Sequence, residues 1–263
     1  MNAVSHLSAD QLACGVITHS SGNHAQALAL AARMNDALAT VVMPSTASAV
    51  KRAAVMGYGA TVIDCQPTLE SREQTTEKIQ KSSGAIFIHP FDDPRIIAGQ
   101  GTAAMELLED EPDLDIILTP VGGGGLLSGT AIAANAINPE IKVIAAEPSG
   151  ADDAFRSKAA NELIMQTSPD TIADGLLTSL GNLTWPIVRD QVDAIVTVTD
   201  DEIVAAMRML WQRAKLLVEP SSATVLAAVL SEQFPDAKPN QKIGLILSGG
   251  NVDLDNLPWM NKM

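Results

Sequence analysis

Strand-length apolar runs alternate with helix-length segments along most of this chain, and this alternation restricts its fold more than any other feature. Strands are expected at residues 16–18, 39–43, 60–64, 85–88, 116–120, 143–146, 194–198 and 242–247. Helices are expected at residues 23–34, 47–56, 71–81, 97–108, 127–138, 200–217 and 221–232. Strands separated by helices imply right-handed crossovers and parallel pairing. The sequence therefore predicts an α/β protein with open, twisted, mostly parallel sheets and helices on both faces.

Three segments give weaker local signals. Residues 8–11 are expected to form the end of a helix and a loop, and residues 149–174 to form loops and a short helix. The helix over residues 200–217 is expected to open at an aspartate cap.

Charge and cysteine content exclude several classes of function. The chain carries 31 acidic and 17 basic side chains, a net charge of −14 that would repel nucleic acid and anionic lipid. It contains no apolar stretch long enough to span a membrane. Cys14 and Cys65 cannot form a disulfide framework and show no metal-binding spacing. We therefore expect a cytoplasmic protein with two reduced thiols and no nucleic-acid or membrane partner.

The strongest motif is the glycine loop, residues 120–126, which joins an expected strand to an expected helix. Residues without side chains let several backbone N–H groups face one anion, and the following helix adds its positive N-terminal end. A flexible linker is the alternative, but the apolar runs on both sides disfavour it. The loop lacks the Lys-Ser/Thr pair of a P-loop, so by itself it predicts phosphate binding without naming the phosphate.

Two further polar segments follow expected strands, where open parallel sheets bind ligands. Residues 18–24 read Thr-His-Ser-Ser-Gly-Asn-His and open a helix. Their hydroxyls and amide could simply cap that helix, although one cap needs only one such residue. Residues 247–251 read Leu-Ser-Gly-Gly-Asn, which alone predicts no more than a turn.

Taken in order, these three segments resemble the fold-type II pyridoxal-phosphate (PLP) enzymes of the serine racemase and threonine dehydratase family. Plant-type serine racemases resemble the chain most. The resemblance covers nearly the whole chain, and its other matches lie at residues 71–73, 97–102, 146–148, 151–153, 172–175, 218–221 and 248–253.

The resemblance implies two α/β domains and a homodimer that acts on serine and threonine. The small domain would cover residues 15–92, and the large domain residues 1–14 together with 93–263. Pyridoxal 5'-phosphate would lie in the cleft between the two domains.

The resemblance also assigns roles around the cofactor. Asn23 would hydrogen-bond its phenolic oxygen, Ser248 would face its pyridine nitrogen, and Ser20 would receive the substrate carboxylate. A hydroxyl beside the pyridine nitrogen makes the ring a weaker electron sink than a carboxylate would. The cofactor phosphate would be held by the backbone amides of Gly122, Gly123, Gly124, Gly125 and Leu126.

Ser21 bears on the reaction, because racemisation needs an acid/base group on each face of the reacting carbon. In the family a lysine serves one face and the serine matched by Ser21 serves the other, whereas threonine dehydratases typically carry alanine there. Phe91 points the other way, since dehydratases and plant racemases share this phenylalanine and animal racemases have asparagine. Both a racemase with dehydratase activity and a dedicated threonine dehydratase therefore stay open, with Ser21 favouring the racemase.

Metal and nucleotide sites are implied as well. Glu147, Asp153 and the Ala151 carbonyl match the family's metal site, and oxygen ligands suit Mg²⁺ or Ca²⁺. Without the resemblance, the two acids would be interpreted as solvated surface groups. Positions that bind ATP as an activator in animal racemases are matched by Gln26, Lys51, Tyr58, Lys215 and Asn251.

One element of the family pattern is missing from the chain. The Schiff-base lysine lies in a Ser-Phe-Lys-x-Arg-Gly-Ala motif that would directly precede Met1, and no lysine of this chain has such a context. We therefore expect the chain as given to be inactive or nearly so. A non-catalytic fragment and a phosphate-binding regulatory protein are the alternatives from other classes, but the second has no need of Ser21 or Asn23.

Overall fold

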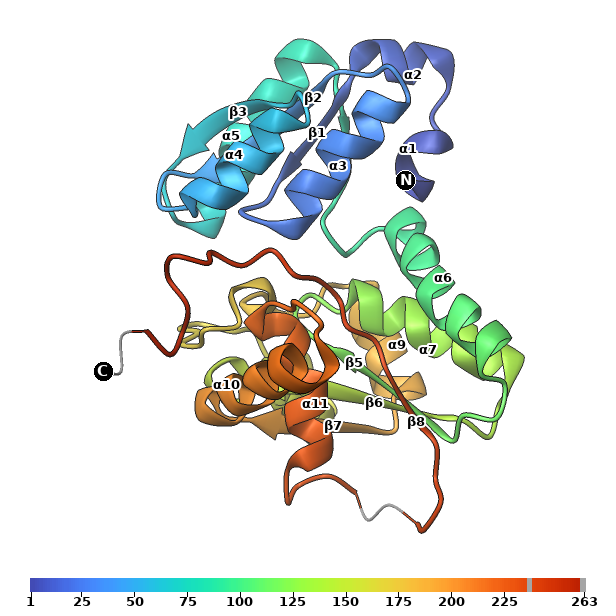
Figure 1. Ribbon diagram of the computed structural model, residues 1–263. Coiled ribbons are helices and arrows are strands. Elements are labelled where there is room, and N and C mark those ends of the chain that lie inside the picture. The colour runs from blue at the N-terminus through green and yellow to red at the C-terminus, as the bar shows by residue number, and fades with distance from the viewer. Residues whose placement is uncertain (236–237, 261–263) are drawn as a thin grey trace. The chain divides into compact units, whose positions relative to one another are not determined.

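The structure, a computed structural model, describes residues 1–235 and 238–260. The chain divides into two compact units, residues 1–99 and 100–263. Each unit contains one four-stranded sheet, with strand order β3-β2-β1-β4 in the first and β7-β6-β5-β8 in the second (Figure 1). Every strand pair is parallel. The predicted α/β class with parallel sheets is confirmed.

The first unit alternates strands and helices as its sequence predicts. Its strands are β1 (Val16–His19), β2 (Ala39–Pro44), β3 (Thr61–Cys65) and β4 (Ile86–Phe87). The helices between them are α3 (Asn23–Met34), α4 (Ala49–Gly57) and α5 (Leu69–Ser83). Neighbouring residues of β2 enter different apolar clusters: Val41 packs with residues of α3 and α4, and Val42 with Ile79 of α5. The sheet is therefore buried on both faces, as apolar parallel strands require.

Two short helices, α1 (Asn2–Ser5) and α2 (Ala9–Cys14), precede β1. The structure places this segment in the first unit, whereas the family resemblance implies that residues 1–14 belong to the large domain. Ala3, Val4 and Leu7 are buried in the same apolar cluster as Val16 of β1. This packing joins residues 1–14 to the first unit, which extends to residue 99 rather than 92.

The prediction of a loop at residues 8–11 is wrong, because helix α2 begins there. Ser8 is the N-cap of α2, where its hydroxyl accepts a hydrogen bond from the Gln11 amide while the Gln11 side chain accepts one from the Ser8 amide. This is a capping box, which satisfies two helix-end donors with one pair of side chains.

The second unit carries more helix around its sheet. Its strands are β5 (Ile116–Pro120), β6 (Lys142–Pro148), β7 (Ala194–Val198) and β8 (Ile243–Leu245). Its helices are α6 (Pro94–Asp110, which crosses the unit boundary), α7 (Gly125–Ile137), α8 (Asp153–Ala160), α9 (Thr184–Gln191), α10 (Asp200–Met209) and α11 (Pro220–Leu230). Short turns of 3₁₀-helix lie at η1 (Ser149–Ala151) and η2 (Asp174–Leu176), and a π-helical turn at η3 (Leu210–Ala214).

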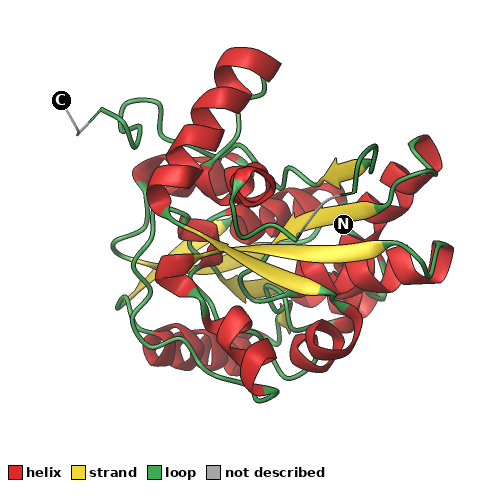
Figure 2. Cartoon of the chain, turned by 90° about the horizontal axis from the view of Figure 1, so that it is seen from below, coloured by secondary structure: helices red, strands yellow, loops and turns green. Residues whose placement is uncertain are grey.

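Alternate residues of the second sheet also enter two clusters. Ile117 of β5 packs with residues of α7 and α9, whereas Ile116 and Leu118 pack with residues of α10 and α11. Helices therefore cover both faces of this sheet, and Figure 2 shows the chain's strands surrounded by helices. The described residues contain no helix long and apolar enough to cross a membrane.

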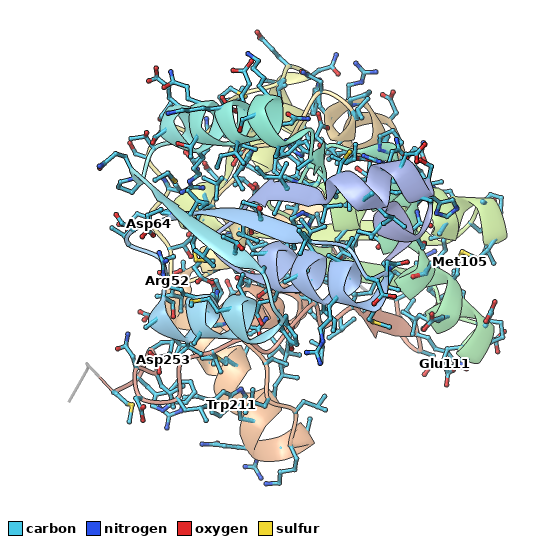
Figure 3. The ribbon with its side chains drawn as sticks, turned by 90° about the horizontal axis from the view of Figure 1, so that it is seen from above. Arg52, Asp64, Met105, Glu111, Trp211 and Asp253 are labelled. Atoms are coloured by element: carbon cyan, nitrogen blue, oxygen red, sulfur yellow. The ribbon has the colours of Figure 1, made fainter. Side chains whose placement is uncertain are left out.

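Helix α10 begins at Asp200 as predicted, but its capping residue and its C-terminal end differ from the prediction. Its N-cap is Thr199, which forms a capping box with Glu202, and not an aspartate. The α-helix ends at Met209 and continues as the π-helical turn, after which Lys215 adopts a left-handed backbone with φ 61°. Within that turn, the Trp211 indole (labelled in Figure 3) donates a hydrogen bond of 3.0 Å to the Val218 carbonyl.

Surface ion pairs tie some neighbouring elements together. In the first unit, Arg52 of α4 pairs with Asp64 of β3, and both side chains are labelled in Figure 3. Such exposed pairs contribute little to stability, so the buried clusters hold the sheet.

Candidate active site

The glycine loop lies at the carboxyl end of β5, a central strand of the second sheet, and leads directly into α7. Gly124 is the N-cap of α7 and has φ 85°, a left-handed conformation that favours glycine. Outside helices and strands, no backbone hydrogen bond between described residues is donated by the amides of Gly122, Gly123 or Gly124. The loop therefore presents amide donors beside a helix N-terminus, the arrangement that binds phosphate.

One side of this loop is covered by the segment that precedes α9. A Cβ added to Gly122 would lie 3.0 Å from Cα of Leu176, and one added to Gly124 would lie 2.6 Å from Cδ2 of Leu180 and 2.9 Å from Cβ of Thr184. The loop is thus a packed element and not a flexible linker. Sequence reasoning did not find Thr184 or helix α9, because Pro186 near the helix start hides its pattern.

At the carboxyl end of β1, the Ser20-Ser21-Gly22-Asn23 loop opens α3. Gly22 is the N-cap, so the cap residue itself has no side chain that could cap the helix. The Ser20 hydroxyl accepts a long hydrogen bond, 3.3 Å, from the Gly22 amide. Helix capping therefore does not explain this group of polar residues, and the N-terminal end of α3 suits a carboxylate.

A buried lysine reaches this loop from α4. The side chain of Lys51 is only 7% exposed, and its Nζ lies 3.5 Å from the position that a Cβ of residue 22 would occupy. The Lys51 ammonium thus adds a positive charge beside Gly22. The two other expected ATP residues of the first unit are the buried Gln26 and the half-buried Tyr58.

The third polar segment follows β8 in the second unit. Ser248 is exposed, and the next residue, Gly249, accepts a hydrogen bond of 3.1 Å from the Glu219 amide. A Cβ on Gly250 would lie 2.6 Å from the Leu217 carbonyl oxygen. The turn after β8 therefore lies against the segment before α11, and this contact brings the chain near Lys215 close to the chain near Asn251.

The histidines of the first unit are packed or hydrogen-bonded. His89 accepts hydrogen bonds at Nδ1 from the amides of Phe91 and Asp92, so its ring proton belongs on Nε2. Its ring packs edge-on against Phe91, with centroids 4.6 Å apart. Burial is the main cause that lowers the pKa of both His19 and His24 to about 4, so both are neutral at pH 7.

Glu147 and Asp153 are both buried, which excludes their interpretation as solvated surface acids. The two Glu147 oxygens accept hydrogen bonds of 2.8 Å from the amides of Ala154 and Phe155, so Glu147 also caps α8. Both oxygens of Asp153 are buried without a hydrogen-bond partner among the described residues. Burial is the main cause that raises the pKa of Glu147 to about 8 and that of Asp153 to about 6.

Two buried carboxylates so close together fit a bound cation, because a buried charge without a partner is costly. Ala151 is also buried, and it lies between them in the chain. Among the described residues, no three His, Cys, Asp or Glu side chains cluster as a metal site. A cation here would therefore need ligands beyond the two carboxylates, such as the Ala151 carbonyl and water.

The strand-end glycine loop of the second unit suits a phosphorylated ligand. In the first unit, the polar loop at the start of α3 suits a carboxylate. The sequence profile of the family described as "Pyridoxal-phosphate dependent enzyme" matches residues 1–249. The chain belongs to this family. The predicted PLP dependence is thereby confirmed.

Similar proteins include both racemases and a dehydratase. The chain is 52% identical over 258 residues to a serine racemase of Dictyostelium discoideum, a match that covers 97% of this chain and 80% of that protein. It is 48% identical over 258 residues to a beta-hydroxyaspartate dehydratase of Paracoccus denitrificans (strain Pd 1222), covering 98% and 81%. The solved structure of maize serine racemase matches with a TM-score of 0.95 and 49% identity, covering 97% of this chain and 78% of that one.

The residues present fit the family's cofactor. The segment before α9 packs against one side of the glycine loop. The loop amides that donate no backbone hydrogen bond among the described residues can therefore bind an anion such as the PLP phosphate. The exposed Ser248 hydroxyl can accept or donate a hydrogen bond, as a neutral partner of a pyridine nitrogen must.

Proposed function

We propose that this protein is a serine racemase that also converts L-serine and L-threonine to their keto acids by β-elimination. The observation that carries the proposal is the Ser20-Ser21-Gly22-Asn23 loop, which places two serines directly before a helix whose N-cap is a glycine. The serine racemases among the relatives support the choice of substrate.

The glycine loop and Ser248 would serve the cofactor. The amides of Gly122 to Gly125 and of Leu126 would hold the phosphate, and Ser248 would hydrogen-bond the pyridine nitrogen. Asn23 would bind the phenolic oxygen. When bound, PLP supplies an electron sink that makes the α-proton of an attached amino acid acidic. A neutral serine at the pyridine nitrogen would make the ring withdraw electrons less strongly than a carboxylate would. Such a site favours reprotonation at Cα or loss of the β-hydroxyl.

Ser20 and Ser21 would act on the substrate. The Ser20 hydroxyl, beside the N-terminal end of α3 and the Lys51 ammonium, would bind the substrate carboxylate. Ser21 would hold or deliver a proton on one face of Cα, while the family's lysine serves the other face. Two groups are needed because a single group returns the proton to the face from which it came.

A dedicated dehydratase is the second candidate, and two observations favour it. One relative of 48% identity is a beta-hydroxyaspartate dehydratase, and Phe91 matches the family's dehydratases. A dehydratase needs no acid on the second face, so Ser21 separates the two candidates. A non-catalytic fragment of either enzyme is the third, because no lysine of the chain has the family's cofactor-binding context.

We also propose a divalent cation, Mg²⁺ or Ca²⁺, at Glu147, Asp153 and the Ala151 carbonyl. The two buried carboxylates and the unpartnered Asp153 oxygens support it. A homodimer, and ATP as an activator at Gln26, Lys51, Tyr58, Lys215 and Asn251, extend the proposal by family resemblance.

Ser21→Ala tests the proposed function in an extended chain that supplies the family's lysine. Conversion of L-serine to D-serine should fall by about 10²–10⁴-fold, the usual cost of deleting a general acid/base. Pyruvate formation from L-serine should persist, because elimination from that enantiomer uses the lysine face. Pyruvate formation from D-serine should fall, since its α-proton faces Ser21.

The measurement is D-serine and pyruvate formed from each enantiomer, with the exposed Ser45→Ala as a matched control. Equal loss of all activities would show that Ser21 is structural and would favour the dedicated dehydratase.

A further inference from the structure

Thr184, the first residue of α9, touches the glycine loop directly. Its side chain is fully buried, and its hydroxyl lies 2.8 Å from the Gly123 carbonyl oxygen. The same hydroxyl accepts a hydrogen bond of 2.8 Å from the Gly181 amide, and the Gly181 carbonyl lies farther away at 3.4 Å. A hydroxyl has one proton to donate, so the shorter contact assigns it to Gly123.

This hydrogen bond fixes the orientation of one peptide in the loop. In a trans peptide the C=O and the following N–H point in opposite directions. Because the Gly123 carbonyl points at Thr184, the Gly124 N–H points away from Thr184 and from the packed side of the loop. The packing of Leu180 and Thr184 against Gly124 keeps α9 and its preceding turn on the closed side.

Without that anchor, the peptide between Gly123 and Gly124 would be easy to turn over, because glycine accepts backbone angles of either sign. A turned peptide would present a carbonyl oxygen, and not an N–H, to a bound anion. The hydroxyl of Thr184 therefore selects the peptide orientation that attracts a phosphate.

We propose that Thr184 is a positioning residue that holds the Gly124 amide toward the cofactor phosphate. The inference rests on the proposed role of the glycine loop in phosphate binding. It adds a residue outside the loop that prepares the loop for its ligand, at a position that sequence reasoning did not single out.

Thr184→Val tests this inference, because valine keeps the shape of threonine and removes the hydroxyl. The ligands are 4'-deoxypyridoxine 5'-phosphate and 4'-deoxypyridoxine, which lack the reactive aldehyde and differ only in the phosphate. Loss of one hydrogen bond should weaken binding of the phosphorylated ligand by about tenfold. Binding of the unphosphorylated ligand should not change, and Thr184→Ser should restore the wild-type preference.

Isothermal titration calorimetry of the 263-residue chain measures both affinities, and thermal unfolding without ligand checks the fold. The exposed Thr178→Val, on the segment before α9, is the matched control. If Thr184→Val does not fold, Thr184→Ala makes the same comparison with a smaller side chain. An unchanged phosphate preference in the folded variant, or equal loss for both ligands, would overturn the inference. A wild-type protein that does not prefer the phosphorylated ligand would overturn the phosphate role of the loop itself, and the inference with it.

Discussion

Asp153 is a buried carboxylate whose two oxygens have no hydrogen-bond partner among the described residues. Glu147, which belongs to the same proposed site, has both oxygens on the N-terminal amides of α8. Each of those oxygens keeps a further lone pair, so helix capping and metal binding are compatible. A cation would relieve the burial cost of both carboxylates at once.

Divalent metal should therefore stabilise the fold through Asp153. A ligand that binds only the native state adds about 2.7 kcal/mol at a hundredfold excess over its dissociation constant. The midpoint of thermal unfolding should be several degrees higher with Mg²⁺ than with chelator, and Asp153→Asn should lose this difference. The exposed Asp170→Asn is the matched control and should keep it. An equal metal response in wild type and Asp153→Asn would place the metal elsewhere.

His24 should make stability depend on pH. Its pKa of about 4, which burial, His89, His19 and the N-terminal amine all lower, is below the ordinary value of 6.5. The unfolded chain therefore binds more protons than the native chain between these values. The stability that the neutral His24 contributes is fully present above pH 6.5 and is lost as the pH falls toward 4.

Lowering the pH from 7.5 to 5 should reduce the free energy of unfolding by about 2 kcal/mol through this one histidine. The measurement is the free energy of unfolding by urea for wild type and His24→Gln at both pH values. Wild type should lose more stability than the variant over this interval. Parallel losses in the two proteins would show that His24 does not titrate in this way.

At the scale of single elements, helix ends are set by side-chain hydrogen bonds that a coarse pattern of apolar residues misses. Helix α3 was predicted with its observed bounds, since its apolar run begins at a glycine and is followed by a polar turn. The capping boxes at Ser8 and Thr199 were not recognised, although the signal of Ser/Thr followed three residues later by Gln/Glu is present in both. Missing the box at Ser8 left α2 unpredicted, whereas at Thr199 only the capping residue was misassigned and the predicted start of α10 at Asp200 is the observed one.

Thr199→Ala should destabilise the second unit through α10. The Thr199 hydroxyl accepts a hydrogen bond from the Glu202 amide and donates one of 2.7 Å to the Glu202 carboxylate. Loss of such a cap typically costs about 1 kcal/mol. Urea unfolding should show this loss in Thr199→Ala and little change in Thr199→Ser. If Thr199→Ala is no less stable than the exposed Thr178→Ala control, the cap has no energetic role.

At the scale of the whole molecule, the alternation of apolar runs was enough to predict parallel α/β sheets, and the family resemblance added that there are two domains. It was not enough to assign the N-terminal helices. Ala3, Val4 and Leu7 pack into the first unit through contacts with residues distant in the chain, which no local pattern contains. The same limit applied to the site: the glycine loop and the serine loop were evident from sequence, whereas Thr184 acts through a contact 61 residues away.

Racemisation requires proton transfer on both faces of the substrate Cα, and a single incubation can detect it. An extended chain that supplies the family's lysine would be incubated with PLP and L-serine in deuterium oxide, with the 263-residue chain as control. We expect D-serine with deuterium at Cα, together with pyruvate, from the extended chain, and no turnover by the control. Pyruvate without deuterated D-serine from the extended chain would contradict the racemase and leave a dedicated dehydratase.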